Sequence, residues 1–173
     1  MSEFEQFALD LADASGSLIR KYFRADLNIE DKADNSPVTV ADRLAETVIR
    51  EMINDKYPSH DILGEEYGFQ NTGSRWKWVI DPIDGTRSFV SGMPIFGTLI
   101  SLLENEVPHL GIIDMPILHE RWFSAIGKEC FFYSSDADHK KVSVKFLERK
   151  TLGRQFYTVP TQKCSTVGKN PFI

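Results

Sequence analysis

The sequence contains only two cysteines, Cys130 and Cys164, and their spacing matches neither a zinc site nor a disulfide framework. It also lacks any apolar run close to the ~20 residues that a membrane-spanning helix requires. The first 15 residues include four acidic residues and no basic one, the reverse of a secretory signal. These absences predict a protein of the reducing cytoplasm that has no membrane partner.

Basic residues are scarce in most of the chain. Residues 1–138 contain 24 of the 25 Asp/Glu residues but only 12 of the 20 Lys/Arg residues. Residues 139–173 contain one acidic and eight basic residues. The acidic majority disfavours nucleic-acid binding and is compatible with divalent cations. We expect one domain over residues 1–145 and an atypical basic tail over residues 146–173, with an interaction module as the alternative interpretation of the tail.

Two amphipathic helices are predicted in the first third of the chain. Apolar residues at helical spacing indicate a helix over residues 2–24, for which Ser2 and Glu5 fit a capping box. A second helix is predicted to begin at Thr39, with Asp42 as the reciprocal capping residue, and to end near residue 57. The residues between the two helices, 26–37, are expected to be a polar connection.

Strands are predicted in the rest of the domain, where the apolar period changes. We expect six of them, over residues 61–66, 75–81, 95–103, 109–115, 121–127 and 129–134. The last two are joined by Gly127-Lys128, which suits a tight hairpin. Two helices followed by mostly sequential strands indicate an α+β fold, with the helices packed on one face of a mostly antiparallel sheet.

The string WVIDPIDGT brings two aspartates close together at the end of a predicted strand. The strand is expected to end at Ile80, after which Pro82 fixes one backbone angle and Gly85 allows a conformation closed to other residues. Asp81 and Asp84 could then converge on one point, where carboxylate oxygens suit Mg²⁺. A surface turn is the alternative, since Asp, Pro and Gly are common in turns. A plain turn would need neither the second aspartate nor the threonine that follows it.

Two other acidic segments could contribute to the same site. Glu65 and Glu66 close the strand predicted over residues 61–66, where adjacent side chains point to opposite faces, so at most one can join a site. Asp42 has a sufficient structural role in its capping box, although a helix start beside a metal site can serve both purposes. Taken alone, these segments are equally compatible with a charged strand end and a helix cap.

The strings PVTVADR, LGEEYG and WVIDPIDGTRSFVSG, in this order and at these separations, resemble the inositol monophosphatase family. The resemblance covers roughly residues 1–145. It is best to the bacterial histidinol-phosphatase branch, because DGTRSFVSG followed by MPIFGTLISLLENEVPHLGIIDMPILHERW is similar to that branch's continuation. It implies the N-terminal half of a layered α/β sandwich. It also implies a phosphomonoesterase that binds two or three Mg²⁺ ions, accepts Mn²⁺, is inhibited by Li⁺ and hydrolyses a small phosphate ester, with L-histidinol phosphate as the expected substrate.

The resemblance also implies a role for each residue of the motifs. The implied metal ligands are Glu65, Asp81, Ile83 through its carbonyl oxygen, and Asp84. The implied catalytic residues are Asp42, Glu65 and Thr86, with Thr86 and Asp42 orienting the attacking water. The implied substrate-binding residues are Gly85, Thr86, Arg87 and Ser88.

One half of the family pattern has no counterpart in the sequence. Members carry a second α/β half with a Trp-Asp motif, whereas Trp76, Trp78 and Trp122 are the only tryptophans here and none precedes an aspartate. We therefore expect the N-terminal part of such a protein, which would be a homodimer in its full-length form. The alternatives are an inositol-1-monophosphatase or another small sugar or nucleotide phosphatase, and a catalytically incomplete fragment that binds metal or phosphate without turnover.

Overall fold

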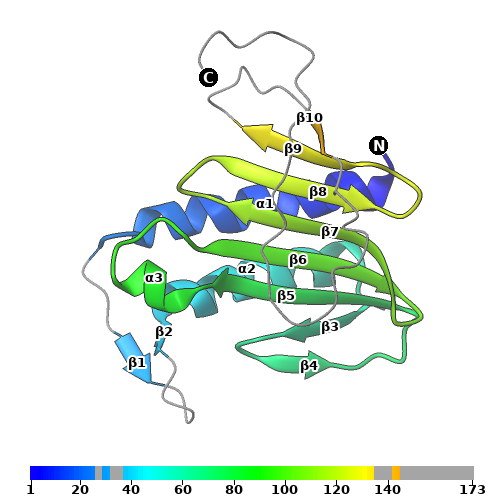
Figure 1. Ribbon diagram of the computed structural model, residues 1–173. Coiled ribbons are helices and arrows are strands. Elements are labelled where there is room, and N and C mark those ends of the chain that lie inside the picture. Colours follow the sequence, from blue (N-terminus) through cyan, green and yellow to red (C-terminus); the bar gives the residue numbers. More distant parts are fainter. Residues whose placement is uncertain (26–28, 32–36, 135–141, 145–173) are drawn as a thin grey trace, which may run out of the picture.

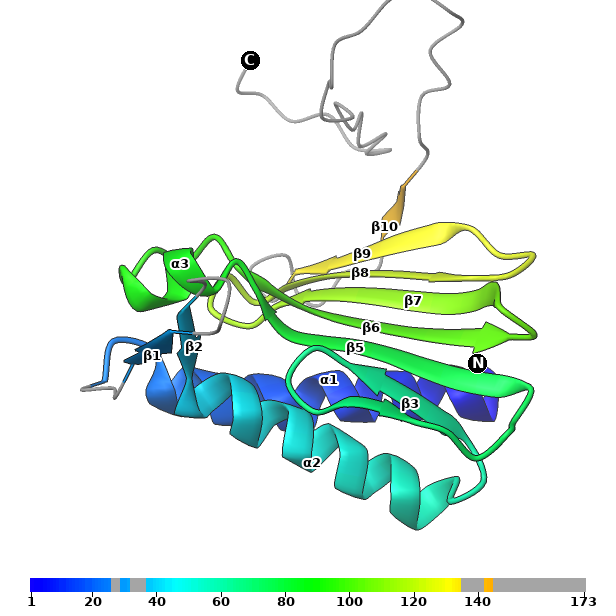
Figure 2. The ribbon, with the colours of Figure 1, turned by 90° about the horizontal axis from the view of Figure 1, so that it is seen from below.

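The computed structural model describes residues 1–25, 29–31, 37–134 and 142–144 of the chain. Within them, two long helices lie side by side on one face of an eight-stranded sheet (Figures 1 and 2). This arrangement confirms the predicted α+β class. No helix of these ranges has both the length and the apolar character needed to cross a membrane. The predicted basic tail, residues 146–173, lies outside the described residues.

Local sequence signals set the bounds of both long helices. Helix α1 spans Glu3–Tyr22 and helix α2 spans Val40–Lys56, so each ends within two residues of its predicted end. The predicted capping boxes are both formed, with Ser2 and Thr39 as the N-cap residues. Each capping side chain satisfies a backbone N–H that has no acceptor within its own helix.

The large sheet has the strand order β10-β9-β8-β7-β6-β5-β3-β4. Neighbouring strands are antiparallel, except for β3 and β5, which run parallel. The turn between the eighth and ninth strands contains Gly127 at φ 71°, in agreement with the predicted tight hairpin. The strands are β3 (Asp61–Gly64), β4 (Gly68–Gln70), β5 (Trp76–Asp84), β6 (Gly97–Glu104), β7 (Val107–Met115), β8 (Glu120–Ala125), β9 (Cys130–Ser134) and β10 (Val142–Val144).

Several short elements were not predicted. The segment expected to be a polar connection contains a two-stranded ribbon of β1 (Ile29–Asp31) and β2 (Pro37–Thr39). Strands β4 and β10 and the helix α3 (Thr86–Val90) were also missed. Elements of three to five residues are too short to display a hydrophobic period, so only their tertiary neighbours reveal them.

Two predicted strand ends were wrong, and both lie at the candidate site. Strand β5 does not end at Ile80 but continues through Pro82 to Asp84. Glu65 and Glu66 do not lie in a strand, because β3 ends at the preceding residue and both occupy the turn to β4. The argument that their side chains alternate across a sheet therefore does not apply.

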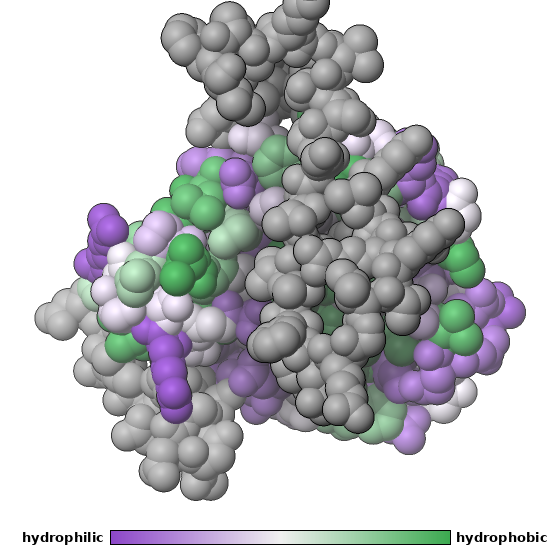
Figure 3. All heavy atoms as spheres, viewed as in Figure 1, coloured by the Kyte–Doolittle hydropathy of each residue, from purple (hydrophilic) through white to green (hydrophobic). Residues whose placement is uncertain are grey.

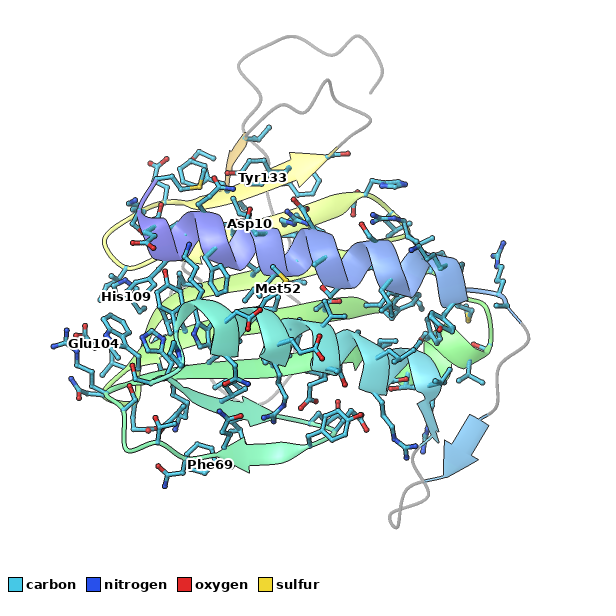
Figure 4. All side chains as sticks on the ribbon, turned by 180° about the vertical axis from the view of Figure 1, so that it is seen from behind. Asp10, Met52, Phe69, Glu104, His109 and Tyr133 are labelled. Atoms are coloured by element: carbon cyan, nitrogen blue, oxygen red, sulfur yellow. The ribbon has the colours of Figure 1, made fainter. Side chains whose placement is uncertain are left out.

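The hydrophobic core lies between the two long helices and the sheet. Trp78 and the residues on alternate positions of the central strands face the helices, where Met52 of α2 lies between α2 and α1 (Figure 4). A second cluster surrounds Ile83, which is fully buried, near the start of α2 and beside α3. Burying each such large side chain contributes about 1.5–3 kcal/mol. Both clusters hold the end of β5, which positions the acidic residues described next.

Candidate metal and phosphate site

A β-bulge explains how Asp81 and Asp84 reach the same side of the sheet. Asp81 pairs with Leu99 and Asp84 with Gly97, so two residues of β5 oppose only Thr98 of β6. In a regular strand, residues three apart point to opposite faces, but one extra residue restores the same face. A bulge is also one of the few places where a sheet tolerates proline, here Pro82. The Thr98 hydroxyl donates to the Pro82 carbonyl at 2.8 Å, which fixes the bulge.

The burial pattern along β5 agrees with this geometry. Ile80 and Ile83 precede the two aspartates, and both are buried in the clusters that face the long helices. Asp81 is half-buried and Asp84 is exposed. The apolar residue of each pair therefore anchors the strand while the following carboxylate lies on the opposite side.

The parallel pairing of β3 and β5 brings Glu65 to the same place. Gly64 is in register with Ile80, and the Glu65 N–H donates to the Ile80 carbonyl at 3.2 Å. Glu65 directly follows the last residue of β3, and Asp81 is the neighbouring residue of the parallel strand β5, three residues before that strand ends. Ligands of open α/β sheets commonly bind outside this end of parallel strands.

Asp81 bears the strongest electrostatic perturbation at the site. Burial, a hydrogen bond shared with Glu65 and the negative charges of Glu65 and Asp84 raise the pKa of Asp81 to about 8. Its Oδ1 atom is buried and has no hydrogen-bond partner among the residues that the structure describes. A buried carboxylate oxygen without a partner is costly, so the described residues leave this oxygen of Asp81 uncompensated.

Asp42 and Thr86 form a second part of the site. The Asp42 side chain is almost fully buried, and its Oδ2 accepts from both the N–H and the hydroxyl of Thr39, at 2.9 and 2.5 Å. The Thr86 hydroxyl lies 3.3 Å from Asp42 Oδ1 and 3.1 Å from the carbonyl oxygen of Ile83. Burial raises the pKa of Asp42, although the hydrogen bonds from Thr39 and Thr86 oppose this effect. The structure therefore joins three of the predicted residues, Asp42, Ile83 and Thr86, by hydrogen bonds.

The segment after β5 turns sharply into helix α3. Gly85 is the N-cap and has φ 93°, a left-handed conformation that favours glycine. The Gly85 carbonyl accepts from the N–H groups of Ser88 and Phe89, which closes the first turn. The side chain of Arg87 is exposed, and that of Ser88 is half-buried. Hydrophobic surface gathers around α3 (Figure 3), where Met93 and Ile95 are about half exposed.

The donor set fits a divalent cation chemically. All predicted side-chain ligands are carboxylates, the hard oxygen donors that Mg²⁺ prefers, and Asp81 Oδ1 has no partner within the described part of the chain. Among the described residues, no group of three or more His, Cys, Asp or Glu side chains is arranged closely enough to hold a metal ion without a change in side-chain conformation. Glu65 and Asp84 are exposed, so rotamer changes can bring their carboxylates closer to Asp81.

One buried acid near the site was not singled out from the sequence. Glu46 of α2 is fully buried, and its carboxylate accepts from the backbone N–H groups of Glu66 and Tyr67. The helical spacing contained a signal, because Glu46 falls on the same stripe as Asp42 and Ile49, both of which are buried. A glutamate on an apolar helix face requires buried partners.

Two helices packed on a mostly antiparallel sheet, with acidic residues near the carboxyl ends of its parallel pair β3 and β5, place the chain in the α+β class. The model of the inositol monophosphatase family matches residues 1–167, so the chain belongs to this family. Family members are phosphatases that hydrolyse phosphate monoesters. The match continues past residue 145, the predicted limit of the resemblance.

Curated relatives support the same assignment. The chain is 51% identical over 132 residues to the bifunctional phosphatase IMPL2, chloroplastic, of Arabidopsis thaliana, covering 73% of this chain and 38% of that protein. It is 42% identical over 138 residues to the histidinol-phosphatase of Mycobacterium tuberculosis, covering 79% and 53% respectively. The chain therefore spans about half or less of the length of these two relatives.

Solved structures confirm the fold. An IMPase of Thermotoga maritima superposes with a TM-score of 0.75 at 30% identity, covering 87% of this chain and 56% of that one. An inositol monophosphatase of Zymomonas mobilis gives a TM-score of 0.66 at 40% identity, covering 85% and 56%. The two helices and mostly antiparallel sheet are thus part of the inositol monophosphatase fold.

Proposed function

We propose that the complete protein is a Mg²⁺-dependent phosphomonoesterase that hydrolyses L-histidinol phosphate to L-histidinol and phosphate. The observation that supports it most directly is the bulged end of β5. There Asp81 and Asp84 share one side of the sheet, beside Glu65, and Asp81 has a buried oxygen to which no described residue donates. Carboxylates alone would repel a dianionic phosphate ester, so the site requires cations before it can bind one.

The proposed metal ligands are Glu65, Asp81, the carbonyl oxygen of Ile83, and Asp84. Bound divalent ions would supply the positive charge that holds the ester and activates the attacking water. The charges of both Glu65 and Asp84 raise the pKa of Asp81, so Asp81 is the carboxylate whose charge bound cations would compensate most. Hydrolysis by this route needs no nucleophilic side chain, so positioning and electrostatics provide most of the rate.

Thr86 and Asp42 are proposed to orient the attacking water. Asp42 Oδ2 is occupied by Thr39, which leaves Oδ1 to accept from the Thr86 hydroxyl. The Thr86 oxygen can then accept a hydrogen bond from water while its own proton is held by Asp42 or Ile83. The pair can in this way fix the direction of a water and take up its proton. The amides of Gly85 and Thr86 and the side chains beyond them are proposed to bind the phosphate.

The substrate assignment is supported by the names of relatives. Histidinol-phosphatases of Mycobacterium tuberculosis and Chlorobaculum parvum are 42% and 39% identical to the chain. An inositol monophosphatase of Mesembryanthemum crystallinum is 36% identical, which makes inositol monophosphate the second candidate. Phosphate release from the two esters, measured in parallel with Mg²⁺, tests the choice. Equal turnover of both, or none of histidinol phosphate, would refute it.

Substitution of Thr86 tests the mechanism. Thr86→Ala should leave Mg²⁺ affinity unchanged and lower kcat by about 10²–10⁴-fold, the usual contribution of positioned proton transfer. Thr86→Ser keeps the hydroxyl and should retain most of the activity. An unchanged kcat in Thr86→Ala would exclude this role. Mg²⁺ binding by the 173-residue chain without turnover would instead favour the incomplete-fragment alternative.

The location and assembly of the full-length protein are proposed from the resemblance and the composition alone. We propose a cytoplasmic homodimer that has neither a nucleic-acid nor a membrane partner. Light scattering on the full-length protein would test the assembly, and a monomer at micromolar concentration would refute it.

A further inference from the structure

The turn that contains Glu65 is hydrogen-bonded to a buried carboxylate on helix α2. Glu46 Oε2 accepts from the Glu66 N–H at 2.7 Å, and its Oε1 accepts from the Tyr67 N–H at 3.2 Å. These are the two backbone donors immediately after Glu65. Two bonds to one rigid helix therefore fix the path of the chain on the C-terminal side of Glu65.

Arg50 completes this attachment. Its Nε lies 2.7 Å from Glu46 Oε1, and its Nη2 donates to the carbonyl oxygen of Gly68, at the start of β4. The Arg50 side chain is 12% exposed and that of Glu46 is fully buried, so solvent screens this pair weakly. Side chains of α2 thus form hydrogen bonds with two backbone N–H groups and one carbonyl group of the same turn.

Gly64 shows how closely the helix approaches the turn. A Cβ atom built at this glycine would lie 1.9 Å from Glu46 Oε1 and 2.4 Å from its carboxyl carbon. The Glu46 carboxylate therefore occupies the space that a side chain at residue 64 would need. On the N-terminal side, the Glu65 N–H is held by the Ile80 carbonyl of β5. Hydrogen bonds therefore hold the backbone both at Glu65 and directly after it.

We infer that Glu46 is a positioning residue, which through the amides of Glu66 and Tyr67 directs the Glu65 carboxylate toward Asp81. This inference rests on the proposed function, because it treats Glu65 as a metal ligand. Glu65 is itself exposed, so without a fixed backbone its carboxylate would sample many positions. Substitution of groups that orient metal ligands typically weakens metal affinity about 10–100-fold.

Glu46→Gln is the sharpest substitution. A glutamine keeps the shape and can still accept through its one oxygen from Arg50 and Tyr67, but its amide nitrogen would face the Glu66 N–H, donor against donor. Glu51→Gln is the matched control, since Glu51 is an exposed glutamate on the same helix. Both variants remove one negative charge, so a difference between them is not due to net charge.

The experiment measures Mn²⁺ affinity by calorimetric titration of the 173-residue chain, well below its melting temperature. We expect Glu46→Gln to bind Mn²⁺ about 10–100-fold more weakly and Glu51→Gln to bind like the unsubstituted chain. The Glu66 and Tyr67 amides should exchange with deuterium faster in Glu46→Gln without metal. A merely structural role would lower the melting temperature without this loss of affinity.

The outcomes separate the inference from the proposed function. Unchanged Mn²⁺ affinity in a folded Glu46→Gln would refute the positioning role while leaving the proposed function intact. No Mn²⁺ binding by the unsubstituted chain would refute the proposed function and this role together. Should Glu46→Gln fail to fold, Arg50→Lys serves in its place. It keeps the charge beside Glu46, loses the bond to Gly68, and should weaken Mn²⁺ binding by a smaller factor; unchanged affinity there also refutes the inference.

Discussion

Replacing Asp81 with asparagine should stabilise the metal-free protein and abolish its stabilisation by metal. A rise in the carboxyl pKa from 3.8 to about 8 corresponds to a cost of roughly 5–6 kcal/mol for a fully buried, ionised group. Asp81 is only half-buried, so its loss of hydration is incomplete and solvent screens the charges of Glu65 and Asp84; we expect about 1–2 kcal/mol. An asparagine can donate to Glu65 in place of the shared proton, so the substitution retains that contact.

The sign of the pH dependence follows from the direction of the shift. Between pH 4 and 8 the folded protein without metal holds a proton on Asp81 that the unfolded chain has released. The cost therefore grows as the pH rises from about 4 and is complete above about 8. Asp81→Asn removes this cost, so its advantage in free energy of unfolding should be small at pH 5 and largest above pH 8.

Urea unfolding of both proteins in EDTA, at several pH values from 5 to 9, measures this difference. Asp10→Asn is the control, because Asp10 is an exposed acid on the outer face of α1 (Figure 4). In saturating Mg²⁺ the order should reverse: a ligand at 100 times its Kd stabilises the unsubstituted protein by about 3 kcal/mol, and the variant gains little. Lower stability of Asp81→Asn in EDTA at pH 8 would refute the reasoning.

Three further predictions concern the surroundings of the site. Burial lowers the pKa of His60, whose Nδ1 accepts a hydrogen bond from Trp78 Nε1 at 3.2 Å. The free energy of unfolding, measured in urea, should therefore fall as the pH drops below about 6.5. His60→Gln should reduce this dependence on pH. Gly85→Ala should cost about 1–2 kcal/mol in thermal unfolding, since φ is 93°. Gly111→Ala should cost less, because no atom of the described residues lies within 4 Å of the added Cβ. Thr39→Ala should cost about 1 kcal/mol by the same measurement and Thr39→Ser far less, because only the alanine loses the cap.

The sequence alone determined the elements whose signals are local. The apolar periodicity and the capping boxes at Ser2 and Thr39 predicted both long helices to within two residues, because a helix satisfies its hydrogen bonds within its own segment. The central strands were also predicted, since one face of each is buried and the alternation shows in the sequence. The motif around Asp81 identified the family without any structure.

Only the tertiary structure decided how the acidic residues meet. The bulge at Pro82 depends on the register of β5 against β6, and the place of Glu65 beside Asp81 depends on the parallel pairing of two strands. The role of Glu46 depends on a helix packed beneath a turn some 20 residues away in the chain. Each is a contact between segments distant in sequence, and such contacts are fixed by the packing of the whole domain, which no local periodicity records.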